Sequence, residues 1–128
     1  MAKLKCSCLC GAVTYTVNAN DTATCCHCSQ CRKQSGHYWA SGTALVDDFD
    51  ITGPVTWYRA SDFAKRGFCP TCGSFLFWKH DDEPKMSFSL GQIDGPSGLS
   101  LQRHIFVTDK GDYYDLNDAV AQTESPAS

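Results

Sequence analysis

Cys69-Pro70-Thr71-Cys72-Gly73 is the stretch of sequence that says most about the fold. Its two cysteines are separated by two residues, with a proline after the first and a glycine after the second. Proline presets a turn conformation, and glycine adopts the left-handed conformation that directs backbone N–H groups toward the sulfurs. Those N–H groups stabilise thiolates, the form of cysteine that binds zinc. The segment therefore predicts a metal-binding knuckle.

The same Cys-x-x-Cys spacing also occurs in thioredoxin-type redox motifs. That motif opens a helix within a strand–helix–strand unit, and the sequence around Cys69 and Cys72 predicts no such unit. We therefore favour metal binding over redox chemistry for this pair.

A structural zinc ion has four ligands, and the knuckle supplies two of them. Cys8-Leu9-Cys10-Gly11 is its natural partner, because residues i and i+2 of a strand face the same side and can converge on one ion. Gly11 then permits a sharp turn into the next segment. The predicted structural site joins the N-terminal hairpin to the middle of the chain through Cys8, Cys10, Cys69 and Cys72.

A second cluster, Cys26-His27-Cys28-Ser29-Gln30-Cys31, places three more sulfurs on one short segment. Three protein ligands with one open position are typical of a catalytic zinc ion. Arg32 and Lys33 follow directly. A cationic pair there would lower thiol pKa values and attract an anionic ligand, so both are predicted to bind substrate.

Two other arrangements of the second cluster stay open. A distant histidine could complete it as a second structural site. Alternatively, a single zinc ribbon could form from Cys28, Cys31, Cys69 and Cys72. The ribbon is disfavoured by its long central gap, and it leaves Cys8, Cys10 and Cys26 without a role.

The remaining cysteines and the histidines have simpler interpretations. Cys6 is predicted to be a plain thiol outside the metal sites, and Cys25 to lie in the core, because neighbours on a strand face opposite ways. His27 is predicted to point away from the metal of its neighbours and to make a structural hydrogen bond. His37 and His104 are each candidates for a site, although a lone histidine is more often a satisfied or solvated one.

Composition and charge exclude several classes of function. The chain has 128 residues and nine cysteines, an odd number that rules out complete disulfide pairing within one chain. A net charge of −3 argues against non-specific binding to nucleic acid or anionic lipid. No apolar run is long enough to span a membrane, and no apolar signal segment precedes the first cysteines. We therefore expect a reducing, cytoplasmic location.

Short alternations of apolar and polar residues, separated by turn residues, predict a mainly β domain with few short helices. One domain is expected over residues 1–118, followed by a flexible tail over 119–128. Helices are predicted only after Cys28 to about residue 34 and around residues 115–120. The predicted strands lie at residues 13–17, 38–46, 55–59, 74–79, 86–90 and 104–107.

The ordered cysteine motifs resemble those of the glutathione-dependent formaldehyde-activating enzyme family, which also includes centromere protein V. The matching segments are residues 8–13, 26–32, 68–74 and 104–107. The resemblance covers about residues 5–118 and implies an Mss4-like fold of small β-sheets around zinc knuckles. It also implies a structural zinc on the four-cysteine set, and a catalytic zinc on Cys26, Cys28 and Cys31.

The family's named reaction joins glutathione and formaldehyde, so the resemblance implies a carbon–sulfur lyase acting on a glutathione or other thiol adduct. Three thiolates overcompensate Zn²⁺, which favours holding a fourth thiolate over activating water. The carboxylates of glutathione would need cations, and the sequence offers Arg32, Lys33, Arg59, Lys65, Arg66 and Arg103. The alternative hypothesis is a non-enzymatic zinc module for protein interaction or metal buffering.

Overall fold

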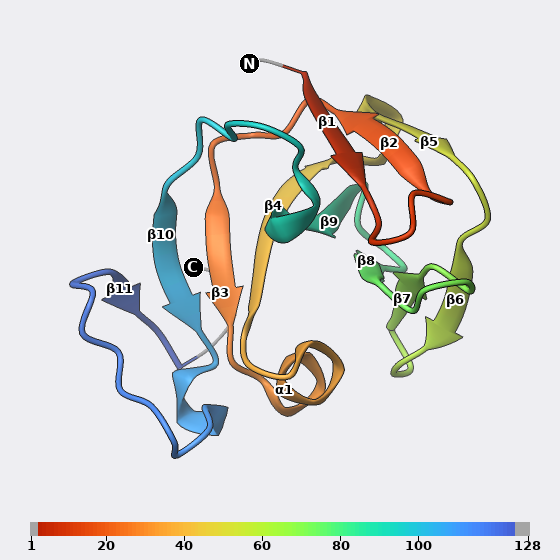
Figure 1. The fold of residues 1–128 in the computed structure, drawn as a ribbon. Helices are drawn as coiled ribbons and strands as arrows, with labels where there is room; N and C mark the ends of the chain where they lie inside the picture. The colour runs from red at the N-terminus through yellow and green to blue at the C-terminus, as the bar shows by residue number, and fades with distance from the viewer. Residues whose placement is uncertain (1–2, 125–128) are drawn as a thin grey trace.

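Two β-sheets and one short helix make up the fold in the computed structural model, which describes residues 3–124 (Figure 1). The smaller sheet has the order β1-β2-β5, with strands β1 (Leu4–Ser7), β2 (Thr14–Val17) and β5 (Phe49–Thr52). The larger sheet has the order β11-β10-β3-β4-β9-β8-β7-β6. Its strands are β3 (Ala23–Cys26), β4 (Trp39–Leu45), β6 (Thr56–Arg59), β7 (Ala64–Phe68), β8 (Phe75–His80), β9 (Lys85–Ser89), β10 (Leu101–Ile105) and β11 (Ala121–Gln122).

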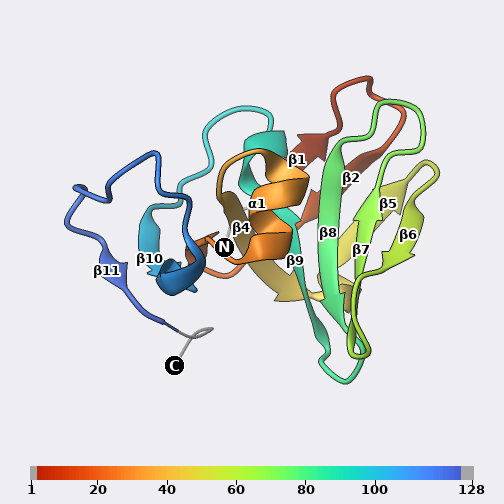
Figure 2. The ribbon, with the colours of Figure 1, turned by 90° about the horizontal axis from the view of Figure 1, so that it is seen from below.

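The helix α1 (Ser29–Ser35) connects β3 to β4, and three 3-10 turns lie at Val46–Asp48, Leu90–Gln92 and Val107–Asp109. Seen from below, α1 stands between the strands near the C-terminus and those of the β6–β9 end (Figure 2). None of the helices in residues 3–124 is long and apolar enough to cross a membrane. This mainly β architecture around cysteine knuckles confirms the expected Mss4-like class.

The core lies between the smaller sheet and the β4–β9–β8 part of the larger one. Val13, Tyr15 and Val17 point inward from the β2 segment, as their alternation predicts. The ring of Tyr15 meets Phe77 of β8 edge-on, with the ring centroids 4.9 Å apart. Phe88 of β9 is fully buried in the same cluster. Burial of these aromatic rings holds the two sheets face to face.

Each of the predicted strands overlaps a strand of the structure, but other strands were missed. None of the predicted strand ranges covers β1, β3, β5, β7 or β11. Strand β7 contains Lys65 and Arg66, and a sequence with two adjacent charged residues is not typical of a strand that is buried on both faces. The parallel pairing of β11 with β10 joins segments distant in the sequence and has no local signal.

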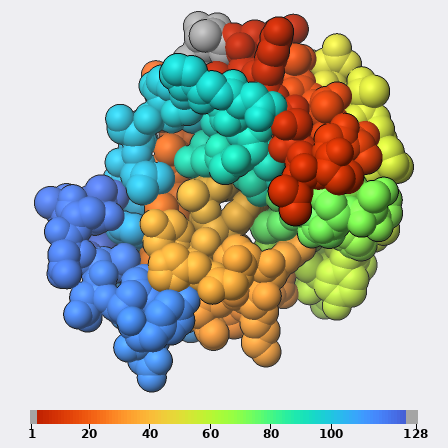
Figure 3. Space-filling model, in the orientation of Figure 1, coloured from red at the N-terminus to blue at the C-terminus, as the bar shows by residue number. Residues whose placement is uncertain are grey.

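The C-terminal region differs from expectation in two ways. The helix predicted around residues 115–120 is wrong, since no helix forms there and Ala119 has a φ of 62°, outside the right-handed helical region. Ala121 and Gln122, within the segment expected to be a flexible tail, pair with Arg103 and His104 of β10. Residues 125–128 of that segment lie outside the described residues. In Figure 3 the blue part of the chain between β10 and β11 lies against the orange region that contains α1.

Close packing between β4 and β9 generates a test of the core. Gly42 faces Phe88 across this strand pair, and a Cβ atom at Gly42 would lie 2.7 Å from a ring carbon of Phe88. Because Phe88 has no room to move, we expect Gly42→Ala to lower the free energy of unfolding by about 2 kcal/mol. Urea denaturation of the metal-loaded protein measures this difference.

Gly91→Ala is the matched control, because a Cβ there meets nothing within 4 Å. We expect its effect to stay within about 0.5 kcal/mol of zero. Equal stability of the Gly42→Ala variant and the wild type would contradict the packing described here.

Candidate metal centres

Four cysteine sulfurs from distant parts of the chain gather into one cluster. Those of Cys8, Cys10, Cys69 and Cys72 all lie within 4.8 Å of one another. The Cys8 and Cys10 sulfurs are 3.7 Å apart, and those of Cys10 and Cys69 are 3.8 Å apart. A tetrahedron with metal–sulfur bonds of about 2.3 Å has edges of about 3.8 Å, so these distances fit a four-thiolate zinc site.

Local turns, rather than a strand, aim the N-terminal pair of sulfurs. The expectation that Cys8 and Cys10 converge because they share a face of a strand is wrong, since β1 ends at Ser7. The chain instead turns, with the Gly11 N–H donating to the Cys8 carbonyl, and Gly11 has a φ of 82°. The Val13 N–H then donates to the Cys8 sulfur at 3.3 Å. Glycine permits this left-handed turn without steric strain.

The knuckle around Cys69 and Cys72 turns at the predicted left-handed glycine, although the N–H of that glycine bonds a carbonyl oxygen rather than a sulfur. Gly73, with a φ of 78°, donates its N–H to the Cys69 carbonyl at 2.8 Å. The sulfur of Cys72 lies 3.2 Å from the Ser74 hydroxyl. Hydrogen bonds from Ser74 are the main reason that the pKa of Cys72 falls to about 5. The knuckle therefore favours the thiolate that a metal ion binds.

The second cluster contains the sulfurs of Cys26, Cys28 and Cys31, again within 4.8 Å of one another. Cys26 ends β3, Cys28 is the N-cap of α1, and Cys31 lies in the first turn of the helix. The sulfur of Cys28 accepts a hydrogen bond from the Cys31 N–H at 3.4 Å. A cysteine can act as an N-cap in this way when its sulfur carries negative charge.

The electrostatics of this cluster also favour a thiolate at Cys28. Hydrogen bonds from the Cys26 and Cys31 thiols hold the pKa of Cys28 far below its ordinary value, and Arg66 contributes in the same direction. The same contacts raise the pKa of Cys26, because one thiolate disfavours another nearby. Such crowding is relieved when a cation binds all three sulfurs.

An apolar wall surrounds one side of the three-sulfur cluster. Trp39 and Phe75 are buried against it, with ring centroids 4.3 Å apart. The indole N–H of Trp39 donates to the Ser89 hydroxyl at 2.7 Å, and that hydroxyl donates to the Phe75 carbonyl at 2.6 Å. These bonds fix both rings beside the sulfurs, where they exclude water and strengthen electrostatic interactions.

Arg66 is a site residue to which the sequence assigned no role. It lies on β7, is 5% exposed, and directs two guanidinium nitrogens at the Cys31 sulfur, each at 3.6 Å. In the sequence analysis it was one of six cations that could bind the carboxylates of glutathione. Its burial depends on contact with α1, some 35 residues earlier in the chain, which no local pattern reveals.

The cations predicted to bind substrate lie outside the three-sulfur cluster. The Nε of Arg32 donates to the Asp109 carbonyl at 2.9 Å, which links α1 to the 3-10 turn at Val107–Asp109. Lys33 follows on the exposed side of the same helix. Binding of substrate by Arg32 and Lys33 stays a prediction.

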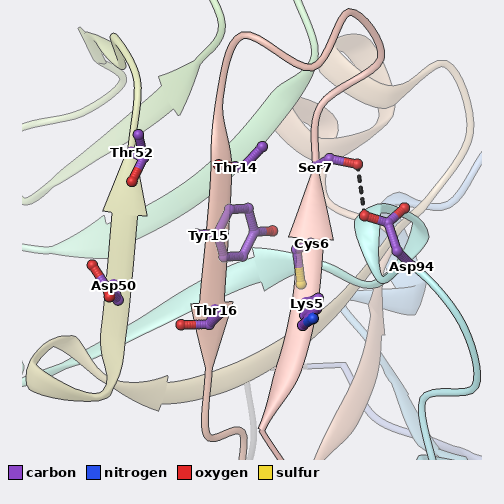
Figure 4. Close-up of a pocket in the computed structure, with 9 residues that line it drawn as sticks. All are labelled: Lys5, Cys6, Ser7, Thr14, Tyr15, Thr16, Asp50, Thr52 and Asp94. Atoms are coloured by element: carbon purple, nitrogen blue, oxygen red, sulfur yellow. Dashed lines mark hydrogen bonds between the residues drawn. The ribbon is translucent and has the colours of Figure 1, made fainter.

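Cys6 and Cys25 lie outside both clusters, as expected. Both are buried, and burial raises the pKa of each thiol to about 11, so they are protonated at neutral pH. Cys6 also borders a hollow of about 340 Å³ over β1, β2 and β5. Figure 4 shows this hollow, where Ser7 donates to Asp94 at 2.7 Å. None of the cluster cysteines lines it.

A chain of hydrogen bonds around the buried rings of His27 and His104 links the residue after β3 to the C-terminal region. Nε2 of His27 lies 2.9 Å from Nδ1 of His104, and Nε2 of His104 lies 2.9 Å from a carboxylate oxygen of Asp118. Nδ1 of His27 pairs with the hydroxyl of Tyr114. The prediction that His27 makes a structural hydrogen bond is thus confirmed, but its partners are 77 and 87 positions away.

This chain of bonds fixes the tautomers of both rings. Burial is the main reason that the pKa of His27 falls to about 4, and electrostatic interactions with the neighbouring His104 and His37 act in the same direction, so the His27 ring is neutral at pH 7. The carboxylate of Asp118 accepts from Nε2 of His104. With a neutral His104, its Nδ1 accepts from Nε2 of His27, and Nδ1 of His27 accepts from the Tyr114 hydroxyl. The C-terminal segment is thereby attached to the strand that carries Cys26.

Comparisons with known proteins show what this chain is similar to in sequence and in fold. The model of a protein family described as "Glutathione-dependent formaldehyde-activating enzyme" matches residues 3–109. An uncharacterized lyase of Schizosaccharomyces pombe is 26% identical over 113 residues, which cover 86% of this chain and 82% of the yeast protein. A crystal structure of a Rhodobacter sphaeroides protein superposes with a TM-score of 0.64 at 26% identity, covering 74% of this chain and 92% of the other.

The buried histidine pair generates a test of stability. His104→Phe conserves the ring but leaves the buried Nε2–H of His27 without an acceptor. Because an unsatisfied buried donor is costly, we expect the free energy of unfolding to fall by about 2 kcal/mol. Urea denaturation of the metal-loaded protein at pH 7 measures the change.

His37→Phe serves as the control for this variant. His37 is also hydrogen-bonded to a tyrosine: its Nδ1 lies 2.8 Å from the hydroxyl of Tyr113. Both of these residues are exposed. Water can replace that bond, so we expect a change of less than about 0.5 kcal/mol. Similar losses in the two variants would show that burial of the His27–His104 pair contributes nothing special.

Proposed function

The chain belongs to the glutathione-dependent formaldehyde-activating enzyme family, and on that premise we propose that it is a zinc-dependent carbon–sulfur lyase acting on a glutathione or other thiol adduct. One observation carries the proposal. The three sulfurs of Cys26, Cys28 and Cys31 form a cluster without a fourth Cys, His, Asp or Glu ligand among residues 3–124. An incomplete protein ligand set is the property that separates catalytic from structural zinc sites.

The charge of the ligand set selects the chemistry. Three thiolates carry more negative charge than Zn²⁺ neutralises, which weakens the polarisation of a bound water molecule. A zinc ion held there supplies an open coordination position that stabilises a substrate thiolate. Addition of a thiol to an aldehyde, or its reverse, fits such a site better than hydrolysis does.

The reaction proposed is balanced without any oxidant or reductant. In the forward direction the thiolate sulfur attacks the carbonyl carbon of an aldehyde, a carbon–sulfur bond forms, and the proton lost by the thiol ends on the former carbonyl oxygen. In the reverse direction the same bond breaks and thiol and aldehyde are released. Trp39 and Phe75 keep water from the sulfur cluster, while Arg32 and Lys33 on α1 are the proposed partners of the glutathione carboxylates.

The four-sulfur cluster has a structural role in this proposal. Its ligands come from the turn after β1 and from the knuckle between β7 and β8. A zinc ion with four protein thiolates has no position left for substrate. We propose two zinc ions per chain, one in each cluster, in a cytoplasmic protein.

Metal content tests the two-site assignment. We expect native mass spectrometry to find two zinc ions in the wild type and one in Cys28→Ser, which should stay folded because α1 and β3 keep their other contacts. Cys72→Ser should lose the other ion and most of the cooperative unfolding transition, since structural zinc contributes directly to folding. Unfolding of Cys28→Ser with retained folding of Cys72→Ser would reverse the two roles.

Activity tests the reaction class. The purified protein should accelerate carbon–sulfur bond formation between glutathione and formaldehyde, or a related thiol–aldehyde pair, above the spontaneous rate. We expect Cys28→Ser to reduce the enzymatic rate at least about 100-fold, because the ion-holding thiolate is lost. The rate is followed by NMR exchange between the free and adducted thiol.

Cys25→Ser is the control for the activity of Cys28→Ser, because it replaces a nearby cysteine that lies outside the cluster. Cys25 is one residue from Cys26 but is buried on the opposite face of β3, where it contacts the Tyr38 hydroxyl. Its activity should stay within about threefold of the wild type. Failure of every thiol–aldehyde pair with a fully zinc-loaded protein would instead favour a non-enzymatic zinc module.

A further inference from the structure

We propose that Arg66 determines which fourth ligand the three-sulfur site accepts, by offsetting the excess negative charge so that an anionic thiolate binds in preference to a neutral ligand. The inference rests on the metal site of the proposed function, and it assigns a role to a residue that the reaction scheme does not use. Arg66 acts through Cys31, so it is a positioning residue for the metal site.

The guanidinium group is held in one orientation by the helix that carries Cys31. Its Nε donates to the Gln30 side-chain oxygen at 3.1 Å, and Nη1 donates to the Gln34 side-chain oxygen at 3.1 Å. Gln30 and Gln34 are four positions apart and therefore lie on the same face of α1. The side-chain amides of Gln30 and Gln34 fix the orientation of the guanidinium group. In that orientation, Nη1 and Nη2 both also contact the Cys31 sulfur.

The positive charge of Arg66 acts strongly on the metal site because the guanidinium group is buried. Arg66 is 5% exposed, and its guanidinium carbon lies 5.3 Å from the centroid of the Phe75 ring. A buried guanidinium stays protonated and needs an anionic partner. Of its partners here, the two glutamine side chains are neutral, and the Cys31 sulfur is the one that would carry negative charge once a metal ion binds it. The pairing holds a positive charge within contact distance of a metal ligand, where solvent screening is weak.

The charges explain a preference for a thiolate. Three thiolates and one divalent ion leave an excess of one negative charge, which Arg66 cancels. With a fourth thiolate bound, the net charge of the site is then −1, whereas it would be −2 without Arg66. A neutral ligand such as imidazole does not change the charge, so its affinity does not depend on Arg66 in this way.

The cations nearer in sequence do not provide this compensation. Arg32 is engaged with the Asp109 carbonyl, and Lys33 is exposed on the helix surface. Water and salt screen exposed charges, so the electrostatic effect of such charges falls off within a short distance. Arg66 is the cation in the described residues that is both buried and in contact with a cluster sulfur.

The test compares two probes on the intact protein with cobalt in place of zinc. 2-Mercaptoethanol supplies a thiolate without other charges, and imidazole supplies a neutral nitrogen ligand. Each is titrated at constant pH while the visible bands of cobalt report its entry. In Arg66→Gln we expect the dissociation constant of the thiol to rise at least about tenfold while that of imidazole changes less than about twofold. Arg66→Lys, which keeps the charge, should recover most of the thiol affinity.

Gln34→Glu tests the same inference if the Arg66 variants do not fold. It is nearly isosteric, lies on an exposed helical position and places a negative charge beside Nη1 of Arg66. We expect a rise of about fivefold in the thiol dissociation constant, without an equal change for imidazole. Gln122→Glu adds the same charge at an exposed position on β11 and should change neither constant.

Equal weakening of thiol and imidazole in Arg66→Gln would show a purely structural role and overturn the inference, as would unchanged affinity for both. The failure of the proposed function is a separate result. Selective loss of thiol binding in Arg66→Gln, together with a wild type that catalyses no carbon–sulfur exchange, would support the role of Arg66 and refute the lyase.

Discussion

Four cysteine sulfurs crowded within 4.8 Å of one another are the constraint around which the two sheets meet. As thiolates without a cation these sulfurs would repel one another, and they belong to segments that share no continuous strand pairing. Cys8 and Cys10 lie in the turn after β1, whereas Cys69 and Cys72 lie between β7 and β8. An ion bound to all four would cross-link the smaller sheet to the larger one beside the core around Tyr15 and Phe77. Cross-links between distant segments matter in a domain of this size, whose hydrophobic core is limited.

The end of β3 and the residue that follows it occupy three different environments. Cys26 belongs to the sulfur cluster, Cys25 is buried on the other face, and His27 is hydrogen-bonded to buried His104, which in turn is bonded to Asp118. The alternation of a strand makes this division possible. One consequence is that the C-terminal segment, through Asp118 and Tyr114, restrains the backbone between two members of the cluster. A second is that α1, which follows at once, supplies both Cys31 and the glutamines that hold Arg66.

The sequence was sufficient for the features that depend on local spacing. The three-sulfur cluster, the two cysteine pairs of the four-sulfur cluster, the helix after Cys28 and the alternation from Val13 to Val17 each follow from residues within a few positions of one another. The joining of Cys8 and Cys10 to Cys69 and Cys72 was predicted from the four ligands that a structural zinc ion needs. The sequence did not predict the other contacts between residues that are far apart in the chain. Strand β7 carries Lys65 and Arg66 and looks polar until Arg66 is paired with Cys31 and Gln34 from α1. The link of His27 to Tyr114, and the parallel pairing of β10 with β11, likewise join segments that local patterns do not connect.

In the proposed arrangement, one cluster has all four of its ligands from the protein and the other has a position open for a thiolate. X-ray absorption at the zinc edge counts the sulfur atoms around the metal directly. For the fully loaded protein without added thiol, we predict an average of about 3.5 sulfurs per zinc, because one site has four and the other three. Excess 2-mercaptoethanol should raise the average to about 4. A value of 4 before addition, or no rise after it, would contradict an open site that binds thiolate.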